Sequence, residues 1–347
     1  MALGQAGAYE WEPVTPRAVG FSEDLGDRLD TAVRDGKLNN IHGVVLVRDG
    51  KLVLERYFTG PDYRWSQRLG IVDFTSETLH DLRSVSKSVV GLLYGIALAE
   101  GKVPALDTAL VEAFPQYGDL AANPERRRIK VAHALTMQLG LEWNENLPYT
   151  DANNSEIAME RAPDRYRFVL ERPIVSEPGT SWQYSGGATA LLAYLITEGT
   201  GMSLLDYVRT RLFEPLGIDN AEWVRGDDGV EAAASGLRMR PADLAKLGQL
   251  ALDKGAGVGQ QLVPTDWLAS SFQPHANVDD DLAYGYQWWI ARRWNWVAAF
   301  GNGGQRMMIL PRMNAVLVVT AGNYDQPDAW RVPVSVLVDV VLPSAEK

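Results

Sequence analysis

The chain has 347 residues, of which 46% are hydrophobic, enough to bury a large core. Its formal net charge of -11 argues against nucleic acid and anionic membranes as partners, because both select basic surfaces. The chain has no cysteine, which excludes disulfides, cysteine nucleophiles and thiolate metal sites.

The first residues carry no targeting signal. Residues 1–8 lack the basic start and apolar core of a signal peptide, so we expect a cytoplasmic protein unless a leader has been removed. The apolar run over residues 88–99 is too short and too interrupted by glycine for membrane insertion.

Early elements follow in chain order. Ser22-Glu23-Asp24 predicts the start of a helix that runs to about Arg34, with acidic residues at its favourable end. Residues 43–47 and 51–58 are predicted strands. Asp49-Gly50 joins them, and this dipeptide is a strong hairpin signal.

A serine and a lysine three residues apart precede a long apolar run. Ser84 and Lys87 stand before residues 89–99, which predict a buried helix. Residues three apart share a helix face, so the hydroxyl and the amine can meet. The helix N-terminus and desolvation both disfavour a cation, so we expect Lys87 to lose its proton more easily. A neutral amine would then be a general base beside a nucleophile. Alternatively, Ser84 only caps the helix and Lys87 lies exposed on its first turn.

The middle of the chain is predicted to be helical. Residues 144–165, rich in Asn, Asp, Glu and Pro, predict a long loop over the site. Tyr184-Ser185-Gly186 precedes a second apolar helix over residues 188–196.

Strand patterns return near the C-terminus. Residues 299–305 lead into a strand over 306–310, and residues 311–314 turn the chain into a strand that ends at 320. A last helix is predicted over 332–342. Strands at both ends with helices between them indicate an α+β fold, in which 1–84 and 256–347 form one lobe around an antiparallel sheet. Residues 85–255 then form an inserted helical lobe, and the active site lies between the two.

The histidines show no ligand spacing. The four residues, His42, His80, His133 and His275, form no metal-binding pair, and we expect each to be structural. No Gly-x-Ser-x-Gly elbow, phosphate loop or dinucleotide fingerprint is present. We therefore expect neither a metal nor a cofactor.

The order of the motifs resembles a known superfamily. A helical Ser-x-x-Lys, the Tyr184 turn and the late strand opened by Gly301-Asn302-Gly303 resemble the serine β-lactamases and penicillin-binding proteins. Residues 134–143, 235–245 and 286–289 carry the same resemblance, which spans roughly residues 20–340. Within the superfamily the chain is most similar to class C-like esterases and 6-aminohexanoate-oligomer hydrolases. The resemblance implies a β-lactamase-like fold.

The resemblance also implies roles. Ser84 would form an acyl-enzyme, and Lys87 would take its proton directly or through Tyr184. The N–H groups of Ser84 and Asn302 would form the oxyanion hole, with Gln305 as the alternative to Asn302. Gly301 would let the strand edge approach the substrate. Aromatic positions match a substrate pocket, although large aromatics more often pack in a core; they are Trp143, Tyr149, Trp288 and Trp289.

Two positions depart from the superfamily pattern. Gly186 stands where the second motif has Asn, and Ala299 stands where the third motif has a cation. Arg306 is close enough in sequence to supply a substitute cation. We therefore expect a serine hydrolase of small esters, with linear amides as a second class of substrate. The alternatives are a β-lactamase, a D-amino-acid peptidase or a catalytically silent penicillin-binding-like module. The expected partners are the substrate and, in a homodimer, a second copy of the chain.

Overall fold

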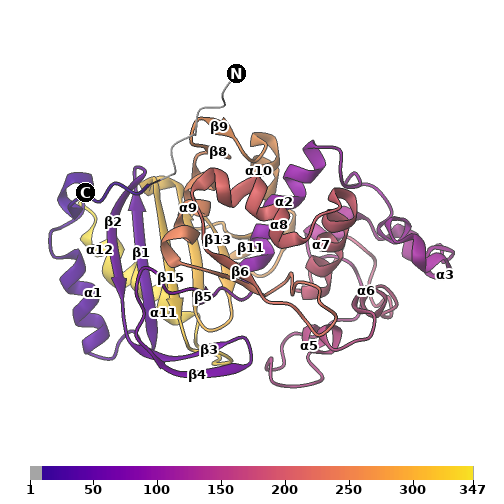
Figure 1. The fold of residues 1–347 in the computed structure, drawn as a ribbon, viewed down its shortest axis with the longest axis horizontal. Coiled ribbons are helices and arrows are strands. Elements are labelled where there is room, and N and C mark those ends of the chain that lie inside the picture. The colour runs from indigo at the N-terminus through magenta and orange to yellow at the C-terminus, as the bar shows by residue number, and fades with distance from the viewer. Residues whose placement is uncertain (1–9, 347) are drawn as a thin grey trace.

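The computed structural model describes residues 10–346 and is built on one eight-stranded sheet (Figure 1). The strand order is β10-β11-β12-β13-β14-β15-β1-β2, and every neighbouring pair is antiparallel. The strands are β1 (Ile41–Arg48), β2 (Lys51–Tyr57), β10 (Ala276–Asn277), β11 (Leu282–Tyr284), β12 (Trp289–Ala291), β13 (Trp296–Gly301), β14 (Gln305–Leu310) and β15 (Ala315–Ala321). The two ends of the chain meet where β1 pairs with β15.

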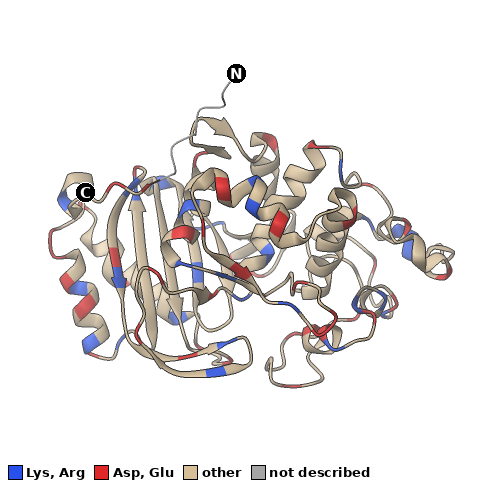
Figure 2. Cartoon of the chain, viewed as in Figure 1, with Lys and Arg blue, Asp and Glu red and all other residues tan. Residues whose placement is uncertain are grey.

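Alternating side chains of the sheet enter two hydrophobic clusters. Val44 and Leu46 pack with the terminal helices, whereas Val45 and Val47 pack with the central ones. This alternation follows from the two-residue period of a strand. The terminal helices are α1 (Leu25–Arg34), α11 (Arg331–Ser335) and α12 (Leu342–Ser344), with a π-helical segment over Val336–Val341 between the last two. Both faces of the sheet are covered, and its strands carry few charges (Figure 2).

The other side of the molecule is mainly helical. Helix α2 (Val85–Ala99) packs against α7 (Gly186–Thr200) in the middle of this helical part. Further helices are α3 (Gly118–Ala121), α4 (Val131–Leu135), α5 (Ser155–Glu160), α6 (Arg165–Leu170), α8 (Leu204–Val208), α9 (Pro241–Leu252) and α10 (Thr265–Ser271). Helix α9 covers β1, β14 and β15.

Three small sheets complete the fold. The first joins β3 (Gly60–Arg64) to β4 (Gln67–Val72), the second has the order β5-β7-β6, and the third joins β8 to β9. Their remaining bounds are β5 (His80–Asp81), β6 (Ala221–Trp223), β7 (Leu237–Met239), β8 (Ala256–Gly257) and β9 (Gln260–Gln261). Strand β5 leads into α2.

The α+β fold class is confirmed, and so are both hairpins. Asp49 and Gly50 have φ values of 52° and 72°, which is the backbone geometry that a two-residue hairpin turn requires. The prediction of a loop over 144–165 is wrong for residues 155–160, which form α5. Asn154 caps this helix, because its side chain accepts hydrogen bonds from the N–H groups of Glu156 and Ile157. The division into lobes stays a prediction.

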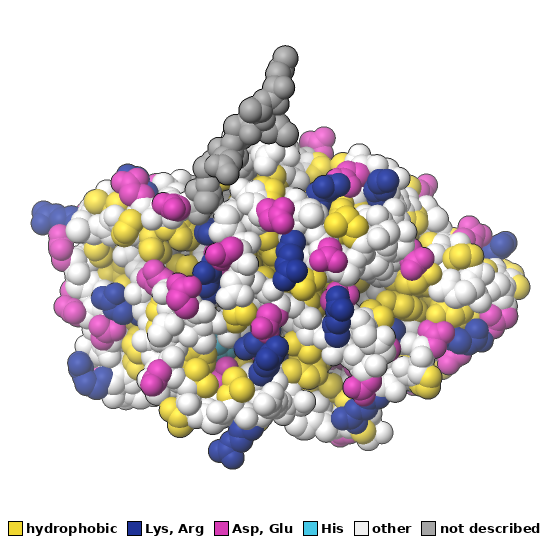
Figure 3. Space-filling model, in the orientation of Figure 1, with side chains coloured by type: hydrophobic (Ala, Val, Ile, Leu, Met, Phe, Trp, Pro, Cys, Tyr) yellow, Lys and Arg dark blue, Asp and Glu magenta, His cyan; other side chains and the backbone are white. Residues whose placement is uncertain are grey.

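The surface mixes both signs of charge. Acidic and basic side chains alternate over the face in Figure 3, without a large patch of one sign. Among residues 10–346, no single helix is both long and apolar enough to cross a bilayer, although α7 and Leu204–Leu216, bent by 75°, would be long enough together. The prediction that the N-terminus lacks a signal peptide concerns residues 1–8, which lie outside the described residues.

Candidate active site

Ser84 and Lys87 meet at the start of α2. Ser84 is the N-cap residue, and the Lys87 Nζ donates a hydrogen bond to its Oγ at 3.1 Å. Both side chains are buried. The residue before Ser84, Arg83, has a φ of 51°, a conformation that is costly outside glycine. Its guanidinium is held by the carbonyl of Trp65 and the carboxylate of Asp81. The turn that presents Ser84 is therefore held in place by contacts of Arg83 with residues that precede the helix.

A carboxylate completes the surroundings of Lys87. Its Nζ also donates to the Ala234 carbonyl at 3.1 Å and to Glu156 Oε2 at 3.3 Å. Glu156 lies on α5 and accepts a further hydrogen bond from the Ser235 hydroxyl. No sequence motif indicated this residue. Its place in the structure depends on the helix that the loop prediction missed.

Glu156 reverses the expected proton affinity of Lys87. Burial lowers the pKa of Lys87, but the charge of Glu156, with smaller effects of Tyr184 and Glu145, more than offsets burial and raises the pKa above its usual value. The expectation of an easily deprotonated lysine is therefore wrong for the resting site, where Lys87 is a cation.

The position of Glu156 also accounts for the glycine at position 186, where the superfamily pattern has Asn. A Cβ built on Gly186 would collide with the Glu156 carboxylate, so a larger side chain fits there only if Glu156 moves away from Lys87. The position where the superfamily pattern has Asn is thus filled from another helix. Glu156 supplies the polar contact to Lys87 from that space.

Tyr184 lies beside the serine–lysine pair, just before α7. Its ring centre is 4.8 Å from the Lys87 Nζ. Burial raises the pKa of Tyr184, while the Lys87 charge and a hydrogen bond with Ser84 oppose this effect, and the net shift is upward. The structure thus brings Ser84, Lys87 and Tyr184 together.

A second carboxylate, that of the half-buried Glu145, lies near the pair. It accepts hydrogen bonds from the Gly186 N–H, from Trp143 Nε1 at 2.5 Å and from the Tyr149 hydroxyl at 3.1 Å. Burial and then the charge of Glu156 raise the pKa of Glu145 to about 7, although Lys87 opposes them. Trp143 and Tyr149, both pocket candidates, therefore orient this carboxylate. Sequence reasoning missed Glu145 as well.

The other aromatic candidates separate into two groups. Trp289 packs among Trp182, Tyr184 and Tyr284, with ring centres 5.3–5.6 Å from its own. Trp288 is fully buried and packs edge-on against Phe272 in the core. Trp289 thus joins the wall around Tyr184, whereas Trp288 does not.

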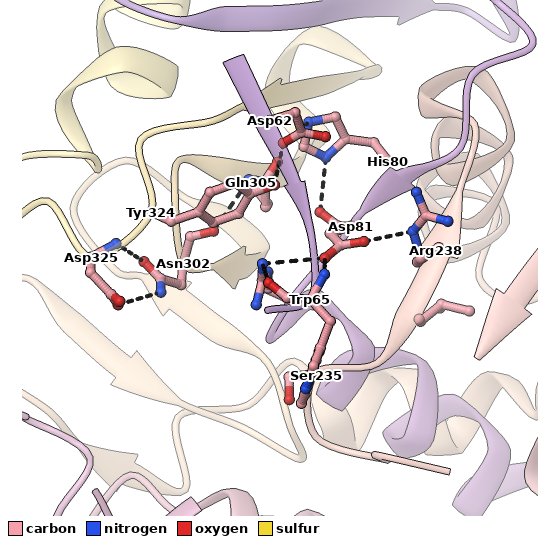
Figure 4. A network of polar contacts seen from close by, with 12 residues as sticks. Asp62, Trp65, His80, Asp81, Ser235, Arg238, Asn302, Gln305, Tyr324 and Asp325 are labelled. Atoms are coloured by element: carbon pink, nitrogen blue, oxygen red, sulfur yellow. Dashed lines mark hydrogen bonds and ion pairs between the residues drawn. The ribbon is translucent and has the colours of Figure 1, made fainter. Parts of the chain in front are cut away.

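The third motif lies at the end of β13. A Cβ on Gly301 would collide with the Leu82 carbonyl, so only glycine allows this strand to approach the segment before Ser84 so closely. The Asn302 side chain and Asp325 exchange two hydrogen bonds, of 2.8 and 3.0 Å (Figure 4). Gln305, the alternative donor, pairs with Gly301 across the β13–β14 hairpin.

Arg306 is a buried cation near the site. Its Nη1 donates to the Gln305 carbonyl at 2.9 Å, and its guanidinium lies 3.9 Å from the centre of the Phe300 ring. Burial lowers its pKa to about 10, although Tyr184 opposes this shift. Within residues 10–346, Arg306 has no carboxylate within ion-pair distance. Ala299 is buried in β13 and carries no charge.

The chain is similar to several known proteins. The Beta-lactamase family model matches residues 31–332. The 6-aminohexanoate-dimer hydrolase of Paenarthrobacter ureafaciens is 26% identical over 331 residues, covering 88% of this chain and 76% of that protein. A Bacillus anthracis protein assigned to the 6-aminohexanoate-dimer hydrolases has a similar structure, with a TM-score of 0.77, 21% identity and coverage of 99% and 90%. EstCE1, a hydrolase with promiscuous acyltransferase activity, has a TM-score of 0.73, 16% identity and coverage of 90% and 97%.

Proposed function

The chain belongs to the Beta-lactamase family and is a serine hydrolase of that family, and we propose that it cleaves small carboxylic esters and linear amides. The observation that carries the proposal is the contact of the Ser84 hydroxyl with the Lys87 amine at 3.1 Å, beside Tyr184. Ser84 Oγ attacks the carbonyl carbon and forms an acyl-enzyme. Water then releases the acid and restores the hydroxyl.

Lys87 and Tyr184 share the role of base. Lys87 is a cation in the resting site, so the pair must lose one proton before it can accept the proton of Ser84. Removing that proton leaves either a neutral amine or a phenolate next to an ammonium. Because the two groups are close, their titrations belong to the pair. The N–H groups of Ser84 and Asn302 are proposed to stabilise the oxyanion.

The aromatic side chains around Tyr184 and the charged groups of Glu145 and Arg306 are complementary to a linear amide substrate. Trp143, Tyr149 and Trp289 are proposed to contact the substrate, with Gly301 leaving room for the chain. A 6-aminohexanoate dimer has an ammonium at one end and a carboxylate at the other. Arg306 and the ionised form of Glu145 carry the complementary charges, and the similarity to 6-aminohexanoate-dimer hydrolases supports this substrate class.

Short aryl esters are expected to be the best substrates in a panel that also contains a linear aminohexanoate dimer and a cephalosporin. The missing Asn at Gly186 and the missing cation at Ala299 each remove a hydrogen bond worth about 1–3 kcal/mol to a β-lactam. Together they lower kcat/KM about a hundredfold. Initial rates across the panel measure this order.

Arg306 provides the control. A cephalosporin kcat/KM equal to that of the best ester would overturn the substrate proposal. In that case Arg306→Ala, compared with the exposed Arg312→Ala, identifies whether the buried cation holds the substrate carboxylate.

Replacing Glu156 with glutamine is expected to move the ascending limb of the pH–rate profile, where activity rises as the base loses its proton, to lower pH. Glutamine retains the hydrogen-bonding capacity but removes the charge that raises the pKa of Lys87, and a charge at this distance shifts a pKa by about 1–3 units. Since the base acts when deprotonated, activity then rises at a lower pH. The measurement is kcat/KM from pH 6 to 11, with Glu112→Gln, an exposed carboxylate, as the control. An unmoved limb would show that Lys87 does not contribute to the base.

A further inference from the structure

Three buried ligand-type side chains converge behind the active site, outside the catalytic machinery. They are His42 on β1, Asp62 on β3 and His80 on β5, with exposures of 0%, 1% and 0%. His42 Nδ1 and His80 Nε2 are 2.8 Å apart, and each is 3.9 Å from Asp62 Oδ1. The sequence indicated no such site, because the three residues come from separate strands.

The outer nitrogen of each imidazole carries its proton. His80 Nδ1 is 2.9 Å from the Asp81 carbonyl, which can only accept, so this nitrogen is the donor. The Asn40 amide nitrogen donates to the Pro61 carbonyl at 3.2 Å. The Asn40 oxygen therefore faces His42 Nε2, at 3.0 Å, and that nitrogen is also a donor.

When both imidazoles are neutral, the inner nitrogens are both unprotonated. A neutral imidazole has one N–H, so His42 Nδ1 and His80 Nε2 direct lone pairs at each other across 2.8 Å. Two lone pairs at this distance repel unless a cation lies between them. Within residues 10–346, Asp62 has no Lys or Arg in ion-pair contact, and its Oδ1 accepts a hydrogen bond from Tyr324 at 2.9 Å. A buried carboxylate of this kind also requires a positive partner.

The three atoms have the spacing of metal ligands. A triangle with sides of 2.8, 3.9 and 3.9 Å has its centre about 2.1 Å from each corner. Zn²⁺ binds imidazole nitrogen and carboxylate oxygen at about 2.0–2.2 Å. The outer hydrogen bonds to Asn40, Asp81 and Tyr324 are the kind that orient histidine and carboxylate ligands in zinc sites.

We propose that His42 Nδ1, His80 Nε2 and Asp62 Oδ1 bind a Zn²⁺ ion, with water as the fourth ligand. The ion would tie β1, β3 and β5 together. Strand β5 continues through Asp81, which binds Arg238 and the Trp65 N–H (Figure 4), into the turn that presents Ser84. The ion therefore stabilises the strand behind the nucleophile and takes no part in the reaction.

A surface pocket provides a path for the ion. Asn40, Gly60, Pro61 and Gly322 line this pocket. A Cβ on Gly60 would lie 2.8 Å from His42 Nε2, and one on Gly322 would lie 2.5 Å from His42 Cε1. The two glycines and the Asn40 side chain therefore separate the imidazole from the pocket.

Metal analysis of the purified full-length protein tests the proposal. After incubation with Zn²⁺ and gel filtration, we expect about one zinc per chain by mass spectrometry. His42→Gln and Asp62→Asn should each retain less than a tenth of that amount. The control His275→Gln, which alters an exposed histidine, should retain all of it. A wild-type protein without zinc, in which the nitrogens share a proton instead, would overturn the proposal, as would equal zinc in His42→Gln.

Cobalt gives a second measurement that needs no variant. Chelator-treated wild-type protein loaded with Co²⁺ should show the visible absorption of a four-coordinate ion with nitrogen and oxygen ligands. Added Zn²⁺ should abolish this absorption. The melting temperature of the protein should rise when either metal is bound. Absence of the absorption would overturn the proposal even if the variants fail to fold.

Discussion

Replacing Ser84 with alanine is expected to abolish labelling by a fluorophosphonate probe and to lower kcat by at least about four orders of magnitude. Ser84 provides the hydroxyl that Lys87 contacts at 3.1 Å, and without it no acyl-enzyme can form. Intact mass after labelling and the burst of product release on an aryl ester measure the two effects.

Neighbouring serines provide the controls. Ser88→Ala alters a hydroxyl that donates to the Gln287 carbonyl at 2.6 Å, and it should retain labelling. Labelling that persists in Ser84→Ala, at Ser86 or Ser185, would contradict the assignment of the nucleophile. Wild-type protein that takes no label at all would favour the catalytically silent module.

Lys87→Ala and Tyr184→Phe should each lower kcat by about a thousandfold, and the double variant should lose far less than the product of the two. Both groups converge on one hydroxyl, so removing either disables the same proton transfer. The measurement is a double-mutant cycle on kcat with one aryl ester.

The cycle also requires melting temperatures, because Lys87→Ala leaves Glu156 buried without its cation. Assays should be run where all four proteins are folded. If the two losses multiply, Lys87 and Tyr184 act independently and the shared base is wrong.

Local patterns made much of the fold and part of the site predictable. The Asp49-Gly50 turn, the apolar helix of α2 and the three-residue spacing of Ser84 and Lys87 are all short-range features, and a sequence displays them directly. The motif order carried the prediction to Tyr184 and to the family.

Long-range electrostatics and packing were not predictable from the sequence. The direction of the Lys87 pKa depends on Glu156, 69 positions away on a helix within a polar segment. Likewise, His42 and His80 have no ligand spacing in sequence, and only the packing of three strands places them 2.8 Å apart. A residue's protonation and ligands depend on neighbours that local periodicity does not identify.

The pairing of β1 with β15 constrains how the chain can fold. Residues 41–48 pair with residues 51–57 on one side, but their neighbour on the other side is residues 315–321, so the centre of the sheet cannot close until almost the whole chain has been synthesised. Contacts of such long sequence separation slow folding, because a large loop must be closed before they form. Until then, the apolar edge of the β1–β2 hairpin lacks its neighbour, and such an unpaired edge is prone to aggregation during synthesis.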